Sequence, residues 1–153
     1  MDVPIDVSQV EIRTARLVLR PWRPEDLADL YAYASVEGVG EMAGWRHHES
    51  PADSEAILKI FISEKNVFAL ADRETGRVIG SLGLHPSWTE EDPAYRGLRA
   101  KEIGYVLAKD CWGRGLMPEA VRAVLAFCFE RCSLDAVTVG HFAGNRQSER
   151  VIE

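Results

Sequence analysis

Hydrophobic residues recur along the chain in two spacings, and each spacing predicts one kind of element. Short segments in which apolar residues alternate with polar ones, or form compact runs bounded by turn residues, indicate β-strands. The turn at Asp72–Gly76 separates two such segments and indicates an antiparallel hairpin. We expect strands over Glu11–Pro21, Val67–Ala71, Arg77–His85, Glu102–Ala108 and Ala136–Phe142.

The second spacing, with an apolar residue every three or four positions, predicts helices. Arg23-Pro24-Glu25-Asp26 opens the first, because proline suits the first turn and acids suit the positive end of the helix dipole. Ser50-Pro51 starts a second helix, whose predicted apolar face is Ile57, Leu58, Phe61 and Ile62. A long helix follows the glycines at 113 and 115 and runs through Arg131, and a last helix begins at Asn145.

The order of these elements predicts the fold class. A strand, two helices, an antiparallel hairpin and a further strand precede a helix, a strand and a helix. This order is typical of an α/β fold with a mixed sheet and helices on both of its faces. A length of 153 residues suits a single domain spanning 1–153.

Composition and charge narrow the classes of partner. A net charge of -6 argues against nucleic acid, whose phosphates require a basic face, and favours cationic acceptors such as amines. We expect no signal peptide and no membrane span, because the apolar runs are short. Three cysteines, an odd count, indicate reduced thiols in a cytoplasmic protein. His47, His48 and His85 lack paired-ligand spacing, so we expect no metal.

Glu102–Ala120 is the most informative stretch, because a strand there ends in a turn with two glycines that enters a helix. The first amides of a helix lack partners within it, and its dipole is positive there. Gly113 and Gly115 let the backbone approach an anion, and Arg114 adds a positive charge. The stretch is therefore either a pyrophosphate cradle or only a tight turn. It lacks the Gly-Lys-Ser/Thr of a P-loop, and Pro118 replaces the third glycine of a Rossmann fingerprint.

The turn resembles the acetyl-CoA-binding motif of the GNAT superfamily, Gln/Arg-x-x-Gly-x-Gly/Ala. Gly113 and Gly115 match its glycines, whereas Asp110 departs from its Gln/Arg position. Trp112 before the glycines and the pair Glu119-Ala120 after them are similar to RimJ/RimL-like members.

The strand that precedes the turn, over Glu102–Leu107, also resembles the RimJ/RimL-like branch. So does Asn145-x-x-Ser148-x-x-Val151, and the resemblance extends from about Ile12 to the last residue.

The resemblance implies a GNAT acyl-CoA N-acyltransferase fold with a mostly antiparallel sheet. Its fourth and fifth strands, at 102–108 and 136–142, would splay apart and hold acetyl-CoA, and Gly104 would either mark a bulge that starts the splay or allow close packing. Main-chain groups of Tyr105–Leu107 would pair with the pantetheine arm. The implied acetyl-CoA-binding residues are Tyr105, Val106, Leu107, Trp112, Gly113, Arg114, Gly115, Leu116, Met117, Pro118 and Asn145.

The implied reaction is direct attack of an amine on the thioester of acetyl-CoA. The chain is thus expected to be an N-acetyltransferase whose acceptor is a primary amine, either a protein N-terminal α-amine or a small molecule. The acceptor ammonium must lose a proton, for which Glu102, His85 and His141 are candidates. Ser148 is implied to protonate the departing thiolate, or it is only a first-turn residue of the helix that Asn145 caps.

The acceptor groove is expected beside the first two helices and the loop that joins them. Glu41, Trp45, His47 and His48 lie in this loop.

The end of the sequence departs from the family pattern. That pattern continues after Val151 with two more strands, whereas this sequence stops at Glu153, which predicts a C-terminally incomplete domain. The sheet edge around Val137 and Val139 would then be open and would favour a homodimer. The missing end supports a second function, a degenerate CoA-binding or interaction module without turnover, whereas the intact turn and Ser148 support the enzyme.

Overall fold

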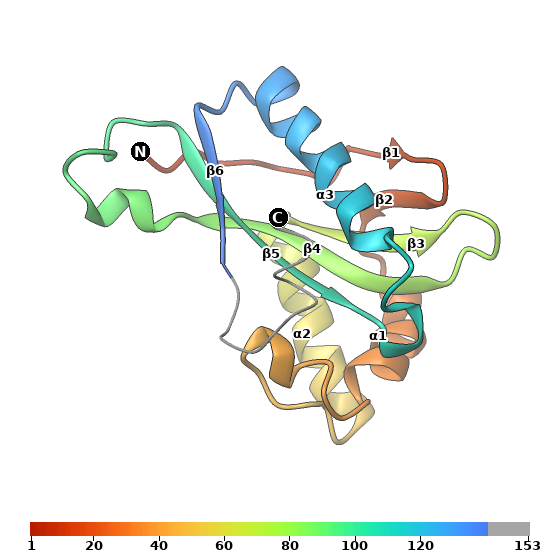
Figure 1. Ribbon diagram of the computed structural model, residues 1–153. Coiled ribbons are helices and arrows are strands. Elements are labelled where there is room, and N and C mark those ends of the chain that lie inside the picture. The colour runs from red at the N-terminus through yellow and green to blue at the C-terminus, as the bar shows by residue number, and fades with distance from the viewer. Residues whose placement is uncertain (141–153) are drawn as a thin grey trace.

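A computed structural model describes residues 1–140 of the chain, and these residues form a mixed sheet with helices (Figure 1). Strands in the described part follow one another across the sheet in the order of the sequence. Neighbouring strands are antiparallel except β5 and β6, which are parallel. The predicted α/β class is therefore confirmed. The strands are β1 (Ile12–Arg13), β2 (Leu17–Pro21), β3 (Val67–Asp72), β4 (Val78–Pro86), β5 (Ala100–Leu107) and β6 (Ala136–Val139).

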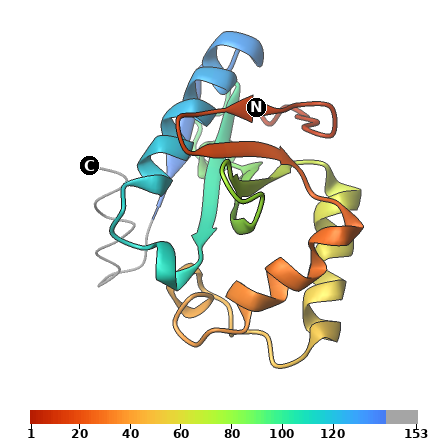
Figure 2. The same ribbon diagram turned by 90° about the vertical axis from the view of Figure 1, so that its right-hand side faces the viewer.

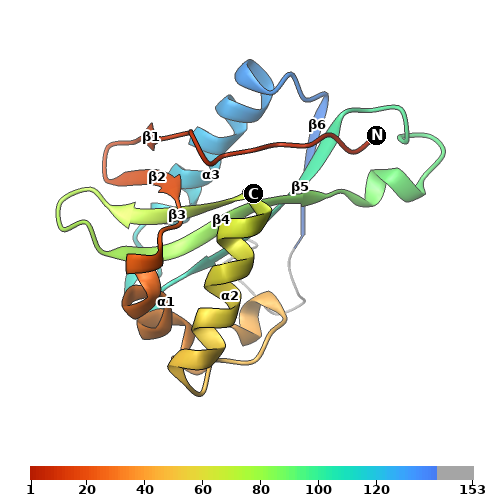
Figure 3. The ribbon, with the colours of Figure 1, turned by 180° about the vertical axis from the view of Figure 1, so that it is seen from behind.

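Helices cover both faces of the sheet, as the sequence predicts. The helices α1 (Leu27–Ala34) and α2 (Pro51–Glu64) pack against each other on one face, and Figure 3 shows α2 in front of the strands with α1 beside it. The helix α3 (Leu116–Ala126) lies on the other face (Figure 2) and continues into a π-helical turn, Phe127–Arg131. None of the helices in residues 1–140 is both long and apolar enough to cross a bilayer.

The segment predicted as one strand over Glu11–Pro21 is two strands, and the prediction was wrong on this point. β1 and β2 pair in an antiparallel hairpin with Ile12 opposite Leu19. Thr14 makes the turn, because its main-chain N–H donates to the Leu17 carbonyl at 2.9 Å and its hydroxyl oxygen accepts from the Leu17 N–H at 3.0 Å. A side chain that can hydrogen-bond its own backbone favours such a turn over a continuous strand.

The start of α1 is fixed by a buried ion pair. Arg20 reaches from β2 and binds the Asp26 carboxylate through both terminal nitrogens, at 2.9 and 2.8 Å. Asp26 also accepts the main-chain N–H of Arg23 at 2.8 Å. The Asp26 carboxylate holds the pKa of Arg20 above its usual range. The predicted helix opening is confirmed, and its acid ties the helix to the sheet.

The core is continuous across the sheet. Leu17, Leu19 and Leu70 are fully buried, and the ring of Phe68 on β3 meets that of Phe127 edge to face at 5.8 Å. Such aromatic pairs add about 0.5–1.5 kcal/mol beyond their buried area. The apolar face predicted for α2 holds except at Ile62, which is 37% exposed and lies off the packed stripe.

The pairing of β5 with β6 ends halfway along β5. Their parallel pairing runs from Ala100 opposite Ala136 to Ile103 opposite Val139, whereas β5 continues to Leu107. β6 ends at Val139, the last paired residue, whereas β5 runs on past it toward α3 (Figure 1). β6 is thus an edge strand of the sheet in residues 1–140, and pairing of this edge with a second copy stays a prediction.

Gly104 does not mark a bulge, so that alternative was wrong. The register between β4 and β5 is continuous through the Gly83–Gly104 pair, and the irregularity in the sheet lies at Leu70/Ala71 in β3. The close-packing alternative holds, because a Cβ at Gly104 would lie 3.3 Å from the ring of His85.

Candidate active site

The turn between β5 and α3 has the backbone geometry of an anion cradle. Gly113 and Gly115 take left-handed φ angles of +77° and +72°, which side chains rarely adopt, and Gly115 precedes the first residue of α3. The amides of Leu116 and Met117 have no acceptor within residues 1–140, and Pro118 has no N–H to satisfy. Free amides at the positive end of a helix dipole can hold a phosphate.

A clamp that the sequence did not reveal braces this turn from the β1–β2 hairpin. Arg16 donates through Nη1 to the Arg114 carbonyl at 2.8 Å and through Nε to the Glu119 carboxylate at 2.9 Å. Thr14 donates its hydroxyl to the same carboxylate at 2.5 Å. Burial opposes ionisation of Glu119, but the hydrogen bonds from Thr14 and Arg16 outweigh it and lower the pKa of Glu119. The clamp therefore fixes the first turn of α3 and adds a second guanidinium to that of Arg114 near Gly115.

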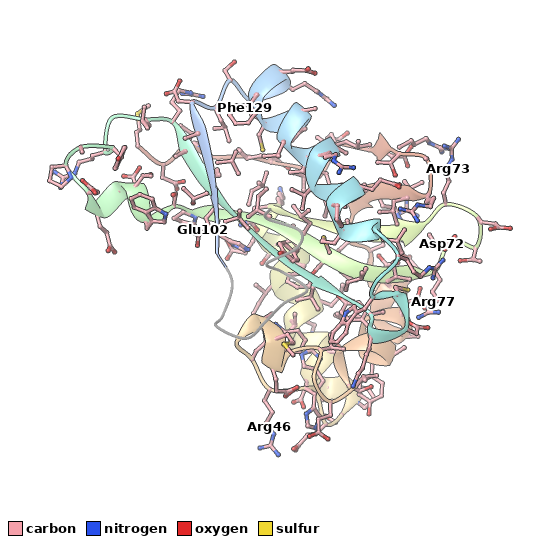
Figure 4. The ribbon with its side chains drawn as sticks, in the orientation of Figure 1. Arg46, Asp72, Arg73, Arg77, Glu102 and Phe129 are labelled. Atoms are coloured by element: carbon pink, nitrogen blue, oxygen red, sulfur yellow. The ribbon has the colours of Figure 1, made fainter. Side chains whose placement is uncertain are left out.

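Asp110, which stands at the Gln/Arg position of the motif, forms an ion pair and is not part of the anion cradle. Its carboxylate accepts from Nη2 of Arg77 at 3.2 Å, and Figure 4 shows Arg77 near the turn. The Arg77 guanidinium lowers the pKa of Asp110. The departure from Gln/Arg thus replaces a neutral or cationic side chain by a surface ion pair that joins the turn to the start of β4.

Main-chain groups of β5 alternate between its two sides. The N–H of Ala108 donates to the Ile79 carbonyl at 2.7 Å, which places the groups of Val106 on the β4 side as well. Those of Tyr105 and Leu107 face the β6 side, where the Leu107 carbonyl accepts from the Trp112 indole at 2.9 Å. Trp112 therefore braces the strand end, and the backbone groups of Tyr105 and Leu107 face the β6 side of β5, beyond the last β5–β6 pair.

A cleft of about 510 Å³ opens on the face of the sheet that α2 covers. The walls come from the loop before α2, from α2 and β3, and from the centres of β4 and β5. Among the lining residues within 1–140, Glu102 and His85 are the two that can carry a charge near neutral pH. The lining residues are Met42, Ala43, Trp45, Phe61, Val67, Ser81, Gly83, His85, Glu102, Ile103, Gly104, Tyr105, Val106 and Gly140.

His85 lies over the two glycines that face each other across β4 and β5. A Cβ on Gly83 would lie 2.5 Å from Nε2 of His85, and one on Gly104 would lie 3.3 Å from its Cδ2. The side chain reaches solvent, yet the protein beneath it partly desolvates the ring. This desolvation and the nearby Lys101 ammonium lower the pKa of His85, against the opposing effect of Glu102.

Glu102 is held by a chain of hydroxyl groups. Thr138 on β6 donates its hydroxyl to Oε1 of Glu102 at 3.1 Å, and the Thr138 and Ser87 hydroxyl oxygens lie 2.8 Å apart. Because Thr138 has a single hydroxyl proton, Ser87 must be the donor in the second bond. Figure 4 shows Glu102 on β5 beside β6. Side chains from β5, from β6 and from the residue that follows β4 therefore meet at this carboxylate, one residue before the last β5–β6 pair.

In the loop that was expected to line the acceptor groove, one of the predicted residues lines the cleft and the others hold the loop in shape. Trp45 lines the cleft. Glu41 accepts the main-chain N–H groups of Gly38 and His47, and these bonds lower the pKa of Glu41 to about 2. His48 is buried, with Nδ1 2.7 Å from the Ser54 hydroxyl, and burial lowers the pKa of His48. Glu41, His47 and His48 thus shape the loop instead of facing the cleft.

Other predicted residues lie outside the described part of the chain. Ser148, Asn145 and His141 fall beyond residue 140, so their roles stay predictions. Within residues 1–140, no three His, Cys, Asp or Glu side chains gather as they would around a metal ion.

Sequence reasoning missed the supporting residues Arg16, Ser87 and Thr138. Two glycines inside strands, at 83 and 104, were the available signal that a large group lies over the sheet.

Comparison with solved structures shows the same fold elsewhere. An acetyltransferase of the GNAT family from Bacillus anthracis superposes with a TM-score of 0.81 at 20% identity, over 94% of this chain and 80% of that one. A protein from Vibrio cholerae, provisionally assigned as a ribosomal-protein-serine acetyltransferase, gives a TM-score of 0.74 at 19% identity, over 95% and 81% of the two chains.

Comparison at the level of sequence reaches the same group of proteins. The uncharacterised protein YkkB of Bacillus subtilis (strain 168) is 24% identical over 157 residues, which cover 95% of this chain and 84% of YkkB. Residues 16–153 match the acetyltransferase (GNAT) domain. The matched range includes both the cradle and the cleft, and the chain therefore belongs to the GNAT family of acetyl-CoA-dependent N-acetyltransferases.

Proposed function

We propose that this enzyme acetylates a primary amine, a protein N-terminal α-amine or a small-molecule amine, in the manner of the RimJ/RimL-like branch. The observation that carries the proposal is the charge of the cleft. Glu102 is an anion on its wall, and no Lys or Arg side chain lines it within residues 1–140. A cationic amine is the acceptor that such a wall attracts. The net charge of -6 adds a weak attraction at longer range.

The two halves of the site would each bind one of the two substrates. The pyrophosphate of acetyl-CoA would lie against Gly113–Met117, where the left-handed glycines and the free amides lie and where Nη2 of Arg16 would be 3.6 Å from a Cβ on Gly115. The pantetheine arm would then follow β5 on the β6 side, toward the cleft at Gly104. The thioester would meet an amine held beside Glu102, where the pairing of β5 with β6 ends.

The chemistry requires a free amine. An α-amino group has a pKa of about 7.7–8.0, so most of it is ammonium at pH 7 and lacks the lone pair for attack. The Glu102 carboxylate, oriented by Thr138, attracts this ammonium into the cleft. Ser148 would protonate the departing thiolate, as the family resemblance implies.

A protein acceptor is supported by one of the similar structures. The Vibrio cholerae protein is assigned, provisionally, to acetylation of a ribosomal protein. The cleft here opens on a face with Trp45 and Phe61 in its walls, which suits the apolar part of a short peptide end as well as that of a small amine. A panel that contains both classes of acceptor is therefore needed.

The proposal is tested by measuring release of the CoA thiol with acetyl-CoA and a panel of amines. We expect turnover with peptides that have a free α-amine or with small primary amines, and none with the same peptides after N-terminal blocking. Mass spectrometry locates the acetyl group on the product. Turnover with hydroxyl acceptors alone would contradict the proposal.

A pair of variants tests the role of the cleft charge. Glu102→Gln keeps the size of the side chain and removes the charge, so the KM for a cationic amine should rise while acetyl-CoA affinity stays the same. Glu91→Gln removes an acid from the exposed loop between β4 and β5, outside the cleft, and serves as the matched control. An equal effect of both changes would mean that net charge, and not the cleft, attracts the amine.

A further inference from the structure

We infer that His85 is the proton acceptor of this enzyme and takes the proton from the acceptor ammonium, while Glu102 binds and orients that ammonium. The inference rests on the proposed function and assigns separate tasks to the two titratable groups of the cleft. The imidazole lies in the cleft near the end of the β5–β6 pairing, and three observations support the assignment.

The first observation is the pair of glycines beneath the ring. Gly83 and Gly104 are directly opposed across β4 and β5, and both lack the side chain that would otherwise occupy this space. The Nε2 edge of His85 fills it, because a Cβ on Gly83 would lie 2.5 Å from Nε2 and 2.9 Å from Cε1. The ring therefore lies over the two glycines and lines the cleft beside the last paired residues of β5.

The second observation is that the ring nitrogens have no hydrogen-bond partner within the described part of the chain, whereas those of His47 and His48 do. An imidazole that serves the loop is held by its partner, as His48 is by Ser54. An imidazole that exchanges protons with a ligand needs at least one nitrogen open to it. His85 meets this requirement in the cleft itself.

The third observation concerns the charges around the ring. Lys101 and Glu102 on β5 act on it with opposite signs, and desolvation also disfavours its cationic form. The loop and α2 contribute Met42, Trp45 and Phe61 to the same cleft, and none of these three side chains titrates. The pKa of His85 is lowered from its usual value of 6.5, so the ring is neutral at pH 7 and able to accept a proton.

Glu102 is better placed to hold a cation than to shuttle protons. Its Oε1 already accepts from Thr138, which in turn accepts from Ser87, and this chain fixes the direction of the carboxylate. Hydrogen bonds to an ionised acceptor are the strong ones and restrain it most. A carboxylate held in this way stays an acceptor for the ammonium while a second group removes the proton.

Nε2 of His85 takes one proton from the ammonium and becomes imidazolium, and the free amine attacks the thioester carbonyl carbon. The carbon–nitrogen bond forms and the carbon–sulfur bond breaks. The second proton lost by the nitrogen goes to the sulfur, directly or through Ser148, and the imidazolium returns its proton to solvent. The products are an acetamide, the free CoA thiol and one proton.

The test is the pH dependence of kcat/KM for an accepted peptide α-amine between pH 5 and 9. We expect the wild type to rise through an acid limb below about 6.5 and then level off. His85→Gln should instead rise about tenfold per pH unit up to the pKa of the amine, because it can use only the free amine. The deficit should be about 10²–10⁴-fold near pH 7 and should narrow as the pH increases. Added imidazole should restore part of the rate of His85→Ala.

His47→Gln is the matched control, since His47 does not line the cleft and contacts Glu41 instead. It should keep the wild-type profile. A His85→Gln enzyme with the wild-type profile and full activity would overturn the inference. So would an NMR titration of the free protein that places the His85 ring above pH 7. A chain that acetylates no primary amine would contradict the proposed function and the inference with it, whereas amine acetylation with an unchanged His85→Gln profile would contradict the inference alone.

Discussion

Gly83→Ala should inactivate the enzyme by moving a ring instead of by unfolding the chain. The new Cβ would lie 2.5 Å from Nε2 of His85, whereas a comfortable contact is about 3.5 Å. The ring must therefore move by about 1 Å. Misplacement of a reacting group by about 1 Å can cost about 10²-fold in rate, so we expect kcat/KM near pH 7 to fall by about that factor.

The protein should tolerate the substitution. Gly83 has no left-handed φ, so alanine adopts its backbone conformation without strain. A Gly-to-Ala change at such a position stabilises by about 0.4–1 kcal/mol through the unfolded chain. That gain offsets the crowding against His85 and against Cγ2 of Val67 at 3.2 Å. The free energy of unfolding should change by no more than about 1 kcal/mol.

Gly104→Ala is the graded control, because its Cβ would lie 3.3 and 3.4 Å from the same ring. The ring then needs to move by only a few tenths of an ångström, and the loss of rate should stay within about tenfold. Thiol release measured beside thermal unfolding gives both quantities for each variant. Equal losses for the two alanines, or full activity of Gly83→Ala at unchanged stability, would refute the reasoning about His85.

Three further predictions concern the other parts of the site. Gly115→Val should weaken acetyl-CoA binding in calorimetry, because its φ of +72° suits glycine and strains a β-branched residue by about 1–3 kcal/mol; unchanged affinity would remove the cradle from the mechanism. Ser148→Ala should lower kcat and leave acetyl-CoA affinity nearly intact, whereas a loss of stability with normal turnover would favour its helix-start role. Glu119→Gln should lower the free energy of unfolding by about 1–3 kcal/mol at pH 7. Because the pKa of Glu119 is lowered in the folded state, thermal melts should show this difference in stability from wild type shrinking as the pH falls through and below the usual glutamate range. A difference in stability that does not depend on pH would contradict this.

Local chemistry explains what could be predicted from the sequence. The compact apolar runs at β3 and β4, the Gly76 turn between them and the proline-started α2 depend on neighbours in the chain, and they formed where expected. Gly113 and Gly115 likewise adopt the left-handed angles that their motif requires.

Register and distance explain what could not be predicted. The position of His85 depends on which residues of β5 oppose Gly83, and the pairing with Gly104 is visible only in the folded sheet. Glu119 was noted for its resemblance to a family pattern, but its partner Arg16 lies 103 positions earlier. The break in the first strand was missed because a single side chain, that of Thr14, made the turn.

The bridge from Arg16 to Glu119 couples the stability of the N-terminal hairpin to the affinity for acetyl-CoA. The hairpin can open only by releasing Glu119 and the Arg114 carbonyl, and so by loosening the turn whose amides would hold the pyrophosphate. Binding and opening are then linked, and linkage is reciprocal: whatever free energy an open hairpin removes from acetyl-CoA affinity, bound acetyl-CoA adds to the cost of opening the hairpin. The main chain of the turn around Thr14 and Leu17 would thus gain amide protection when the ligand binds.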